Sequence, residues 1–544
     1  MNTFRHIKRA SARGLLPLLL LSVLALNACG DSGPQPAAVS VLNRGTGDEP
    51  ESLDMHKASS TGAGDVQRDI GEGLLGFTPD GELRAAAAES WEISADGREY
   101  RFRLRPDARW SNGDSVTAED FVYSFRRLVD PATAALYVKS VDSIENASAI
   151  MAGELPPEAL GVSASASHEL RIRLVHAVPY FLSLLTHPST FPVHPGSVEE
   201  HGDAHARAGN HVSNGAYKLV AWQLGSHIEL ARNEQYWNNA ETAIDRVNHY
   251  VSPEAMSELN RFRAGELHVT HTIPPESFRQ MQEERPDEVR VSPALAVYYY
   301  GFNMTKPEFA GNSRLREALS MAIDRETIAN EVMGRGEKPA YGWVPDGTAN
   351  YDSQRFSYAD MPKDERHHKA RQLFQEAGYS EENPLTVELR YNTSNIHQRI
   401  AASVQAMWQD VLGVETTLVK EEFQVMLANI QQKEVTEVFR LNWSGDYNDA
   451  HTFLSTLESD NPSNLTGYQS ADFDSLMERA AEQTEPGHRK VFLEEAERVL
   501  LRDHPVMPLY FYVNKSMVSK RVGGWGDNVL NYHYSQHLSL TSEE

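Results

Sequence analysis

The chain has 544 residues, of which 76 are acidic and 51 are basic, so its formal net charge at pH 7 is −25. This charge argues against nucleic acid as a partner and against binding to anionic lipids through a basic patch. The length exceeds that of one typical domain, so we expect two or three domains.

Residues 1–28 have the pattern of a secretory signal peptide. A basic leader precedes an apolar run from Leu15 to Leu26, which is too short to span a bilayer. The run ends in Leu-Asn-Ala-Cys-Gly, which resembles a lipobox, and Cys29 is the only cysteine of the chain. We therefore expect lipidation of Cys29, followed by a flexible tether over residues 29–40. An ordinary secretory signal that happens to contain a cysteine is the alternative.

Strand and helix patterns alternate irregularly after the tether, which indicates a mixed α/β protein. Residues 100–105 alternate apolar and arginine side chains, which predicts a half-buried strand. Thr117 predicts a helix N-cap before a buried stripe of Phe121, Phe125 and Leu128. The same patterns predict strands over residues 170–174 and 385–389, a helix from Ser313 to Ile323, and a helix that contains residues 400–408.

The sequence lacks the motifs of the common enzyme classes. It has no G-x-S-x-G nucleophile elbow, no phosphate-binding loop of the G-x-x-x-x-G-K-[ST] type and no H-E-x-x-H pair. Metal coordination is an alternative, because the chain has 21 histidines. Their polar surroundings favour solvent exposure instead, so we expect no enzymatic activity, no metal and no cofactor. The candidate metal ligands are His201, His205 and His211, and the pair His367 and His368.

Several motifs resemble those of the bacterial oligopeptide-binding family, within the superfamily of peptide- and nickel-binding receptors. The longest is REYRFRLRPDARWSNGDSVTAEDFVYSF at residues 98–125. Its many fixed spacings exclude chance as an explanation. Others are ESLDMH at 51–56, NGAYKL at 214–219, RNEQYW at 232–237, YYY at 298–300, YNTS at 391–394 and YFYVN at 510–514, so the resemblance covers essentially the whole mature chain.

The resemblance implies a periplasmic binding protein-like fold of the α/β class, with two lobes, three domains and mixed sheets. Closure about a hinge would bury the ligand. Domain I would comprise residues 41–71, 196–297 and 514–544, domain II residues 72–195, and domain III residues 298–513.

The resemblance also implies a monomeric receptor that delivers short peptides to the permease subunits of an ABC transporter. It would be lipid-anchored in the periplasm or on the cell surface. A receptor of the same fold for murein peptide, a nickel chelate or haem is the first alternative. An enzyme or an extracytoplasmic chaperone is the second.

A receptor for peptides of any sequence must bind the groups that all peptides share, which are the backbone, the ammonium and the carboxylate. By resemblance, Asp446 would bind the ammonium, and Arg440 and His397 the carboxylate. An extended strand would place Arg440 and Asp446 on one face, about 20 Å apart, which suits a tri- or tetrapeptide. Without the resemblance, Asp446 would be a capping residue, and Arg440 and His397 would form solvent-facing salt bridges.

The resemblance implies a pocket around the peptide, although plain core packing is the alternative for its aromatic residues. Met333 stands where relatives that take longer peptides have a lysine, with Arg335 or Lys338 as possible substitutes, and Ser59 stands at a family glutamate. Ligand length and any preference for basic side chains therefore stay open. The implied pocket residues are Trp443, Ser444, Gly445, Tyr299, Tyr512, Thr61 and His271.

Overall fold

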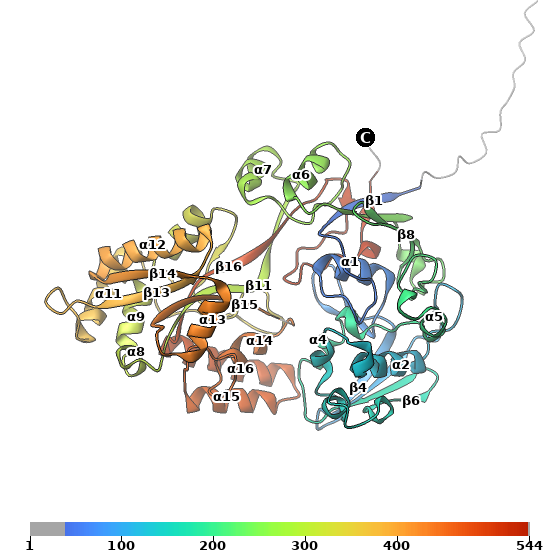
Figure 1. Ribbon diagram of the computed structural model, residues 1–544, viewed down its shortest axis with the longest axis horizontal. Helices are drawn as coiled ribbons and strands as arrows, with labels where there is room; N and C mark the ends of the chain where they lie inside the picture. Colours follow the sequence, from blue (N-terminus) through green and yellow to red (C-terminus); the bar gives the residue numbers. More distant parts are fainter. Residues whose placement is uncertain (1–38, 446, 542–544) are drawn as a thin grey trace, which may run out of the picture. The chain divides into compact units, whose positions relative to one another are not determined.

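The structure, a computed structural model, describes residues 39–445 and 447–541 (Figure 1). Residues 40–544 belong to one unit, which contains every element named below. Cys29 and Asp446, expected to carry the lipid and to bind the ligand's ammonium, lie outside the described residues. No helix in the described ranges combines the length and the apolar character that a membrane span requires.

A four-stranded sheet with the order β1-β10-β9-β8 lies near the start of the described chain. β1 pairs in parallel with β10, and the other two pairs are antiparallel. Helix α1 (Thr61–Ile70) packs on this sheet through Val66 and Ile70, which are fully buried with Tyr217 of β8. The strands are β1 (Val41–Gly47), β8 (Tyr217–Gln223), β9 (His227–Arg232) and β10 (Arg246–Val251).

A second four-stranded sheet, β4-β5-β7-β6, is antiparallel. The predicted alternating strand is confirmed as β5 (Glu99–Leu104), which buries its apolar residues and exposes its arginines. The predicted capped helix is confirmed as α2 (Ala118–Val129), which Thr117 and Asp120 begin with a capping box. The other strands are β4 (Ala88–Ile93), β6 (Val162–Ala166) and β7 (Glu169–Arg173).

The largest sheet has six strands in the order β12-β16-β11-β15-β13-β14. The predicted strand at 385–389 corresponds to β13, one residue later at its start. The strands are β11 (Val289–Phe302), β12 (Lys338–Pro339), β13 (Thr386–Asn392), β14 (Glu415–Glu421), β15 (Val438–Ser444) and β16 (Val506–Met517).

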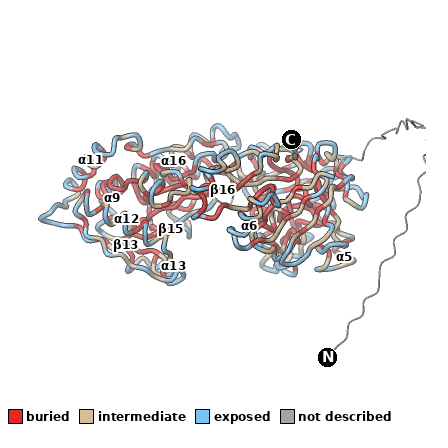
Figure 2. The backbone as a smooth tube through the Cα atoms, turned by 90° about the horizontal axis from the view of Figure 1, so that it is seen from above, coloured by how far each residue is buried: buried red, intermediate tan, exposed pale blue. Residues whose placement is uncertain are grey.

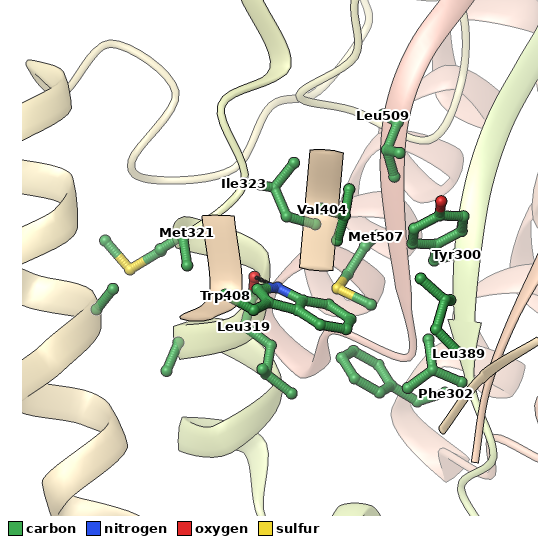
Figure 3. Packing of buried hydrophobic residues seen from close by; sticks show 14 of the residues in the cluster. Tyr300, Phe302, Leu319, Met321, Ile323, Leu389, Val404, Trp408, Met507 and Leu509 are labelled. Atoms are coloured by element: carbon green, nitrogen blue, oxygen red, sulfur yellow. Dashed lines mark hydrogen bonds between the residues drawn. The ribbon is translucent and has the colours of Figure 1, made fainter. Parts of the chain in front are cut away.

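Helices cover both faces of this sheet. On one face, Trp408 lies beside Leu319, Val404 and Met507 (Figure 3), and its indole nitrogen donates to the Leu319 carbonyl at 2.9 Å. The predicted helix from Ser313 ends at Met321, before Ile323, although Ile323 still packs in this core. This face carries α9 (Ser313–Met321), α11 (Lys363–Glu376) and α12 (Asn395–Leu412), and the other carries α13 (Phe423–Gln432), α14 (His451–Leu454), α15 (Ala471–Ala481) and α16 (Pro486–Asp503).

Strands β11 and β16 run from the six-stranded sheet toward α6 (Ala255–Arg263) and α7 (Phe278–Glu284) (Figure 1). Their register breaks where Ala294–Ala296 of β11 lie opposite Tyr512 of β16, between the pairs Pro293↔Val513 and Val297↔Phe511. Such a bulge bends a strand and unpairs its backbone locally.

Buried chain follows the sheets and the helix faces turned toward them, and exposed chain lies on the outside (Figure 2). The remaining elements are β2 (Leu75–Phe77), β3 (Leu83–Ala85), β17 (Val522–Gly523), β18 (Ser539–Leu540), α3 (Ala147–Met151), α4 (Phe181–Leu184), α5 (Pro195–His201), α8 (Pro307–Ala310) and α10 (Arg325–Thr327).

Candidate functional site

Two connected cavities, of about 780 Å³ and about 450 Å³, adjoin the C-terminal end of β15. The larger one is lined on one side by Ser444, Gly445, Tyr447 and Asn448, and on the other by residues from two segments, among them Leu136, Tyr137, Ser140, Asp142 and Ser143 of the first and His176, Tyr180 and His187 of the second. The smaller one is lined by the bulge at Ala294–Ala296. Both cavities are lined by Ser444, Gly445, Leu530 and Tyr532. Of the residues implied by the resemblance, these cavities bring together Thr61, Ser444, Gly445 and Tyr512.

Strand β15 has a free edge beside these cavities. Its pairing with β11 is continuous from Val438 to Ser444, whereas its pairing with β13 involves only Val438 and Phe439. From Leu441 to Ser444, no described strand pairs with the β13 side of β15. A free edge of this kind can bind an extended peptide through backbone hydrogen bonds.

Arg440 lies on β15 opposite Tyr300 and is only 4% exposed. Its Nη1 donates to Asn392 Oδ1 at 3.1 Å, and its Cζ lies 4.4 Å from the centroid of the Tyr298 ring. Its Nε is buried without a hydrogen-bond partner, and within the described residues Arg440 forms no ion pair. A buried guanidinium without a carboxylate is costly, so an anionic group bound beside it would be strongly stabilised.

His397 lies in the first turn of α12 and is linked to Arg440 through Tyr298. Its Nδ1 is 3.3 Å from the Tyr298 hydroxyl. Burial, followed by the positive charge of Arg440, lowers the pKa of His397 to about 4. The imidazole is therefore neutral at pH 7, and a carboxylate bound nearby would raise its pKa again. Neither Arg440 nor His397 lines the two cavities, but Asn442, on the same face of β15 as Arg440, lines the smaller one.

The structure places Tyr299 away from Arg440. Alternate residues of a strand point to opposite faces, so Tyr298 and Tyr300 share the face of Arg440, and Tyr299 points to the other. There it packs edge-on against Trp343, with ring centroids 4.8 Å apart, in the hydrophobic core. Tyr299 thus packs in the core, and its role as a pocket wall stays a prediction.

Trp443 and His271 also lie apart from the cavity linings. Trp443 is half-buried and packs against the same core as Tyr299, with its indole nitrogen buried and without a partner. His271 follows α6, and its backbone nitrogen donates to Glu258 Oε1 at 2.9 Å. Neither residue lines the cavities beside β15.

Met333 and Ser59, the two residues that depart from the family pattern, both lie in described parts of the structure. Met333 is 7% exposed in the core, and Arg335 lies 3.5 Å from the carboxylate of Glu337. Both Ser59 and Ser60 donate hydrogen bonds to Glu51, including one of 2.9 Å from the Ser59 hydroxyl. Arg335 thus lies beside Glu337, although its Nε makes no hydrogen bond to a described residue, and the carboxylate near Ser59 belongs to Glu51.

In the described part of the chain, no three His, Cys, Asp or Glu side chains are grouped to hold an ion. His205 lies 3.9 Å from Asp54, and that carboxylate pairs with Arg127 at 2.7 Å. Of the other histidines considered, His368 is exposed.

Sequence reasoning assigned no role to Asn392 or Tyr298, although both contact Arg440. Both belong to motifs that carried the family resemblance. The signal that could have found Tyr298 is the period of two along a strand, because it puts Tyr298 and Tyr300 on one face. Asn392 gave no such signal, because its contact joins two strands that are distant in sequence.

Comparisons with known proteins identify the family of the chain. The pattern of the "Bacterial extracellular solute-binding proteins, family 5 Middle" matches residues 82–464. The chain is 37% identical over 533 residues to the periplasmic oligopeptide-binding protein OppA of Escherichia coli, covering 97% of this chain and 98% of that protein.

Among solved structures, the unliganded open form of MppA, a periplasmic murein tripeptide binding protein, is similar with a TM-score of 0.89 and 34% identity. The match covers 93% of this chain and 98% of that one. Haemophilus influenzae OppA in complex with RPPGFSPFR gives a TM-score of 0.67 and 34% identity, over 93% of this chain and all of the other.

Proposed function

Because the chain belongs to the bacterial extracellular solute-binding proteins, family 5, we propose that it captures short peptides beside β15 and delivers them to the permease of an ABC transporter. The observation that carries the proposal is the buried guanidinium of Arg440, which forms no ion pair among the described residues. A peptide carboxylate would supply the missing charge. Relatives with nearly the same length carry oligopeptide binding in their names.

The free edge of β15 suggests how the peptide backbone would be held. A peptide extended along Leu441–Ser444 would complete the backbone hydrogen bonds that no described strand supplies. Its carboxylate would lie at Arg440 and His397, and its ammonium at Asp446. The two cavities would receive its side chains, beside Thr61, Tyr512 and the backbone of Gly445.

The proposal extends to the domains. The strands of the first four-stranded sheet all fall in the expected domain I, and those of the second all fall in domain II. Strands β12–β15 fall in domain III, whereas β11 and β16 run across the boundaries at residues 297 and 513. These two strands would therefore form the hinge about which the lobes close.

The proposal also includes removal of residues 1–28, lipidation of Cys29, a tether over residues 29–40 and a monomeric state. The protein would be anchored by its lipid in the periplasm or on the cell surface, and it would catalyse no reaction. Mass spectrometry of the protein from its native host tests the lipid, since a diacylglycerol on Cys29 adds a defined mass.

The test of peptide binding uses one tripeptide in three forms: unmodified, N-acetylated and C-amidated. The unmodified peptide should raise the melting temperature, because it binds only the folded state. Each modification should weaken binding by about 100-fold or more in isothermal titration calorimetry, because it leaves a buried protein charge unpaired. Peptides that leave the melting temperature unchanged at millimolar concentration would refute the proposal.

Murein peptide is a second candidate ligand, because MppA, a murein tripeptide binding protein, is 34% identical to the chain over 93% of its length. Native mass spectrometry of the purified protein separates the two candidates. A mixture of masses that correspond to ordinary peptides supports the first, and a single mass that corresponds to a murein peptide supports the second.

A further inference from the structure

A side pocket of about 150 Å³ adjoins the larger cavity beside β15. It shares Thr61, Tyr137, His187 and Tyr532 with that cavity, so a group bound in the larger cavity can reach it. Its wall is formed by residues 58–60 and by one side of α1, from Thr61 to Arg68. None of the described residues that line this side pocket is acidic.

Arg68 is the cation of this pocket, and it is only 7% exposed. Its guanidinium makes no hydrogen bond to any described residue, although it has five N–H donors. Its Cζ lies 3.5 Å from the centroid of the Tyr532 ring, and its Nη1 is 3.6 Å from Asp65 Oδ1, which is too long for a hydrogen bond.

Arg325 and Arg489, which are also buried, differ from Arg68. The guanidinium of Arg325 donates to the carbonyl oxygens of Ala340 and Pro508, and that of Arg489 to both oxygens of Asp449. The guanidinium groups of these arginines therefore find hydrogen-bond acceptors within the fold. Arg68 keeps unused donors beside a cavity, which is the arrangement of a site for an anion.

The surroundings of Arg68 favour an anion from outside the chain. Glu51, the acid near the pocket rim, already accepts hydrogen bonds from Ser59 and Ser60. Partial burial raises the pKa of Glu51, but these hydrogen bonds outweigh burial and lower the pKa to about 2. Burial and the charge of Arg68 lower the pKa of His187 to about 4, so its imidazole is neutral. Because His187 Nδ1 accepts from the Ser189 backbone nitrogen at 3.2 Å, its Nε2 carries the proton and can donate.

We propose that this side pocket is a subsite for an acidic side chain of the ligand, whose carboxylate pairs with the guanidinium of Arg68. The inference rests on the proposed peptide binding and specifies the class of peptide: one with glutamate or aspartate at the position that faces the pocket. Ser59 contributes to this preference, because a glutamate at that position would put a second negative charge at the pocket wall.

The test compares tripeptides that carry glutamate or glutamine at each position in turn, on an otherwise alanine sequence. At one position, the glutamate peptide should bind at least about fivefold more tightly than its glutamine isostere, since a charged acceptor roughly doubles the strength of a hydrogen bond. C-amidated versions of that pair should keep the same ratio if the side chain is the carboxylate that Arg68 binds.

Three variants assign the preference to Arg68. Arg68→Met should reduce the glutamate-to-glutamine ratio to about one, and Arg68→Lys should retain part of it. Asp65→Asn should increase the ratio, because it removes the competing acid, whose side chain makes no hydrogen bond and no other ion pair with the described residues. An increase cannot result from misfolding. Arg261→Met is the matched control, because Arg261 also lies over a tyrosine ring but lines no cavity described above.

The outcomes separate this inference from the proposed function. If no tripeptide binds to the unmodified protein, the proposed function is wrong. If tripeptides bind without a preference for glutamate, or if the preference persists unchanged in folded Arg68→Met, the subsite is wrong and peptide binding stands. A ratio that disappears on C-amidation would mean that the pocket binds the terminal carboxylate, which also contradicts the inference.

Discussion

Replacing Arg440 by methionine should weaken ligand binding strongly without destabilising the empty protein. In the empty protein, the guanidinium makes one hydrogen bond, to Asn392, and one contact with the Tyr298 ring. Their loss costs about 2–4 kcal/mol together. Burying an unpaired charge costs several kcal/mol, and methionine removes this cost while it fills most of the same space. We therefore expect Arg440→Met to leave the empty protein equally stable or more stable by about 1–2 kcal/mol.

The same substitution should weaken binding of an unmodified tripeptide by roughly 100- to 5000-fold, because the buried ligand carboxylate loses a partner worth about 3–5 kcal/mol. Urea denaturation of the empty protein and titration calorimetry with the tripeptide measure the two effects. Arg325→Met is the control, since it removes a fully buried arginine that donates to several backbone carbonyls and should destabilise the protein strongly. If Arg440→Met destabilises the empty protein as much as this control does, Arg440 is a structural residue and the reasoning fails.

Three further predictions follow from the structure. Burial lowers the pKa of His56, His504 and His533 to about 3. Below pH 6.5 the unfolded chain therefore binds protons that the folded chain excludes, so the free energy of unfolding should be highest above pH 6.5 and fall toward pH 4. Urea midpoints at pH 7 and pH 5 measure this difference. N-methylation of an amide in the middle of the peptide should weaken binding by roughly 5- to 10-fold if the edge of β15 binds the backbone, as titration calorimetry will show. A Cβ at Gly445 would lie 2.9 Å from Thr452 Cγ2, so Gly445→Ala should reduce peptide affinity by displacing the chain at the cavity wall, and an unchanged dissociation constant would contradict this.

Local features of the fold could be predicted from the sequence. Residues 100–105 and the helix after Thr117 were found because period and capping are local signals. The order of the six-stranded sheet could not be predicted, because β11 pairs with β15 and β16, which come much later in the chain. Such pairing depends on the packing of whole layers rather than on any local pattern.

The candidate site shows the same limit. The resemblance pointed to Arg440 and His397, and the structure joins them through Tyr298. The resemblance could not distinguish Tyr299 from Tyr298 and Tyr300, because a motif does not state which face of a strand a residue occupies. Arg68 was not found, because its environment depends on Tyr532, far along the chain, and on the lack of a hydrogen bond between its guanidinium and any described residue.

The unpaired stretch of β15 from Leu441 to Ser444 has a consequence for handling the purified protein. An uncovered strand edge is also a template for another copy of the same chain, and natural sheets usually protect such edges. At high concentration, ligand-free molecules should therefore self-associate through this stretch, and a bound peptide should act as a cap that keeps them apart. Removal of endogenous ligand before crystallisation would then expose this strand edge and promote self-association.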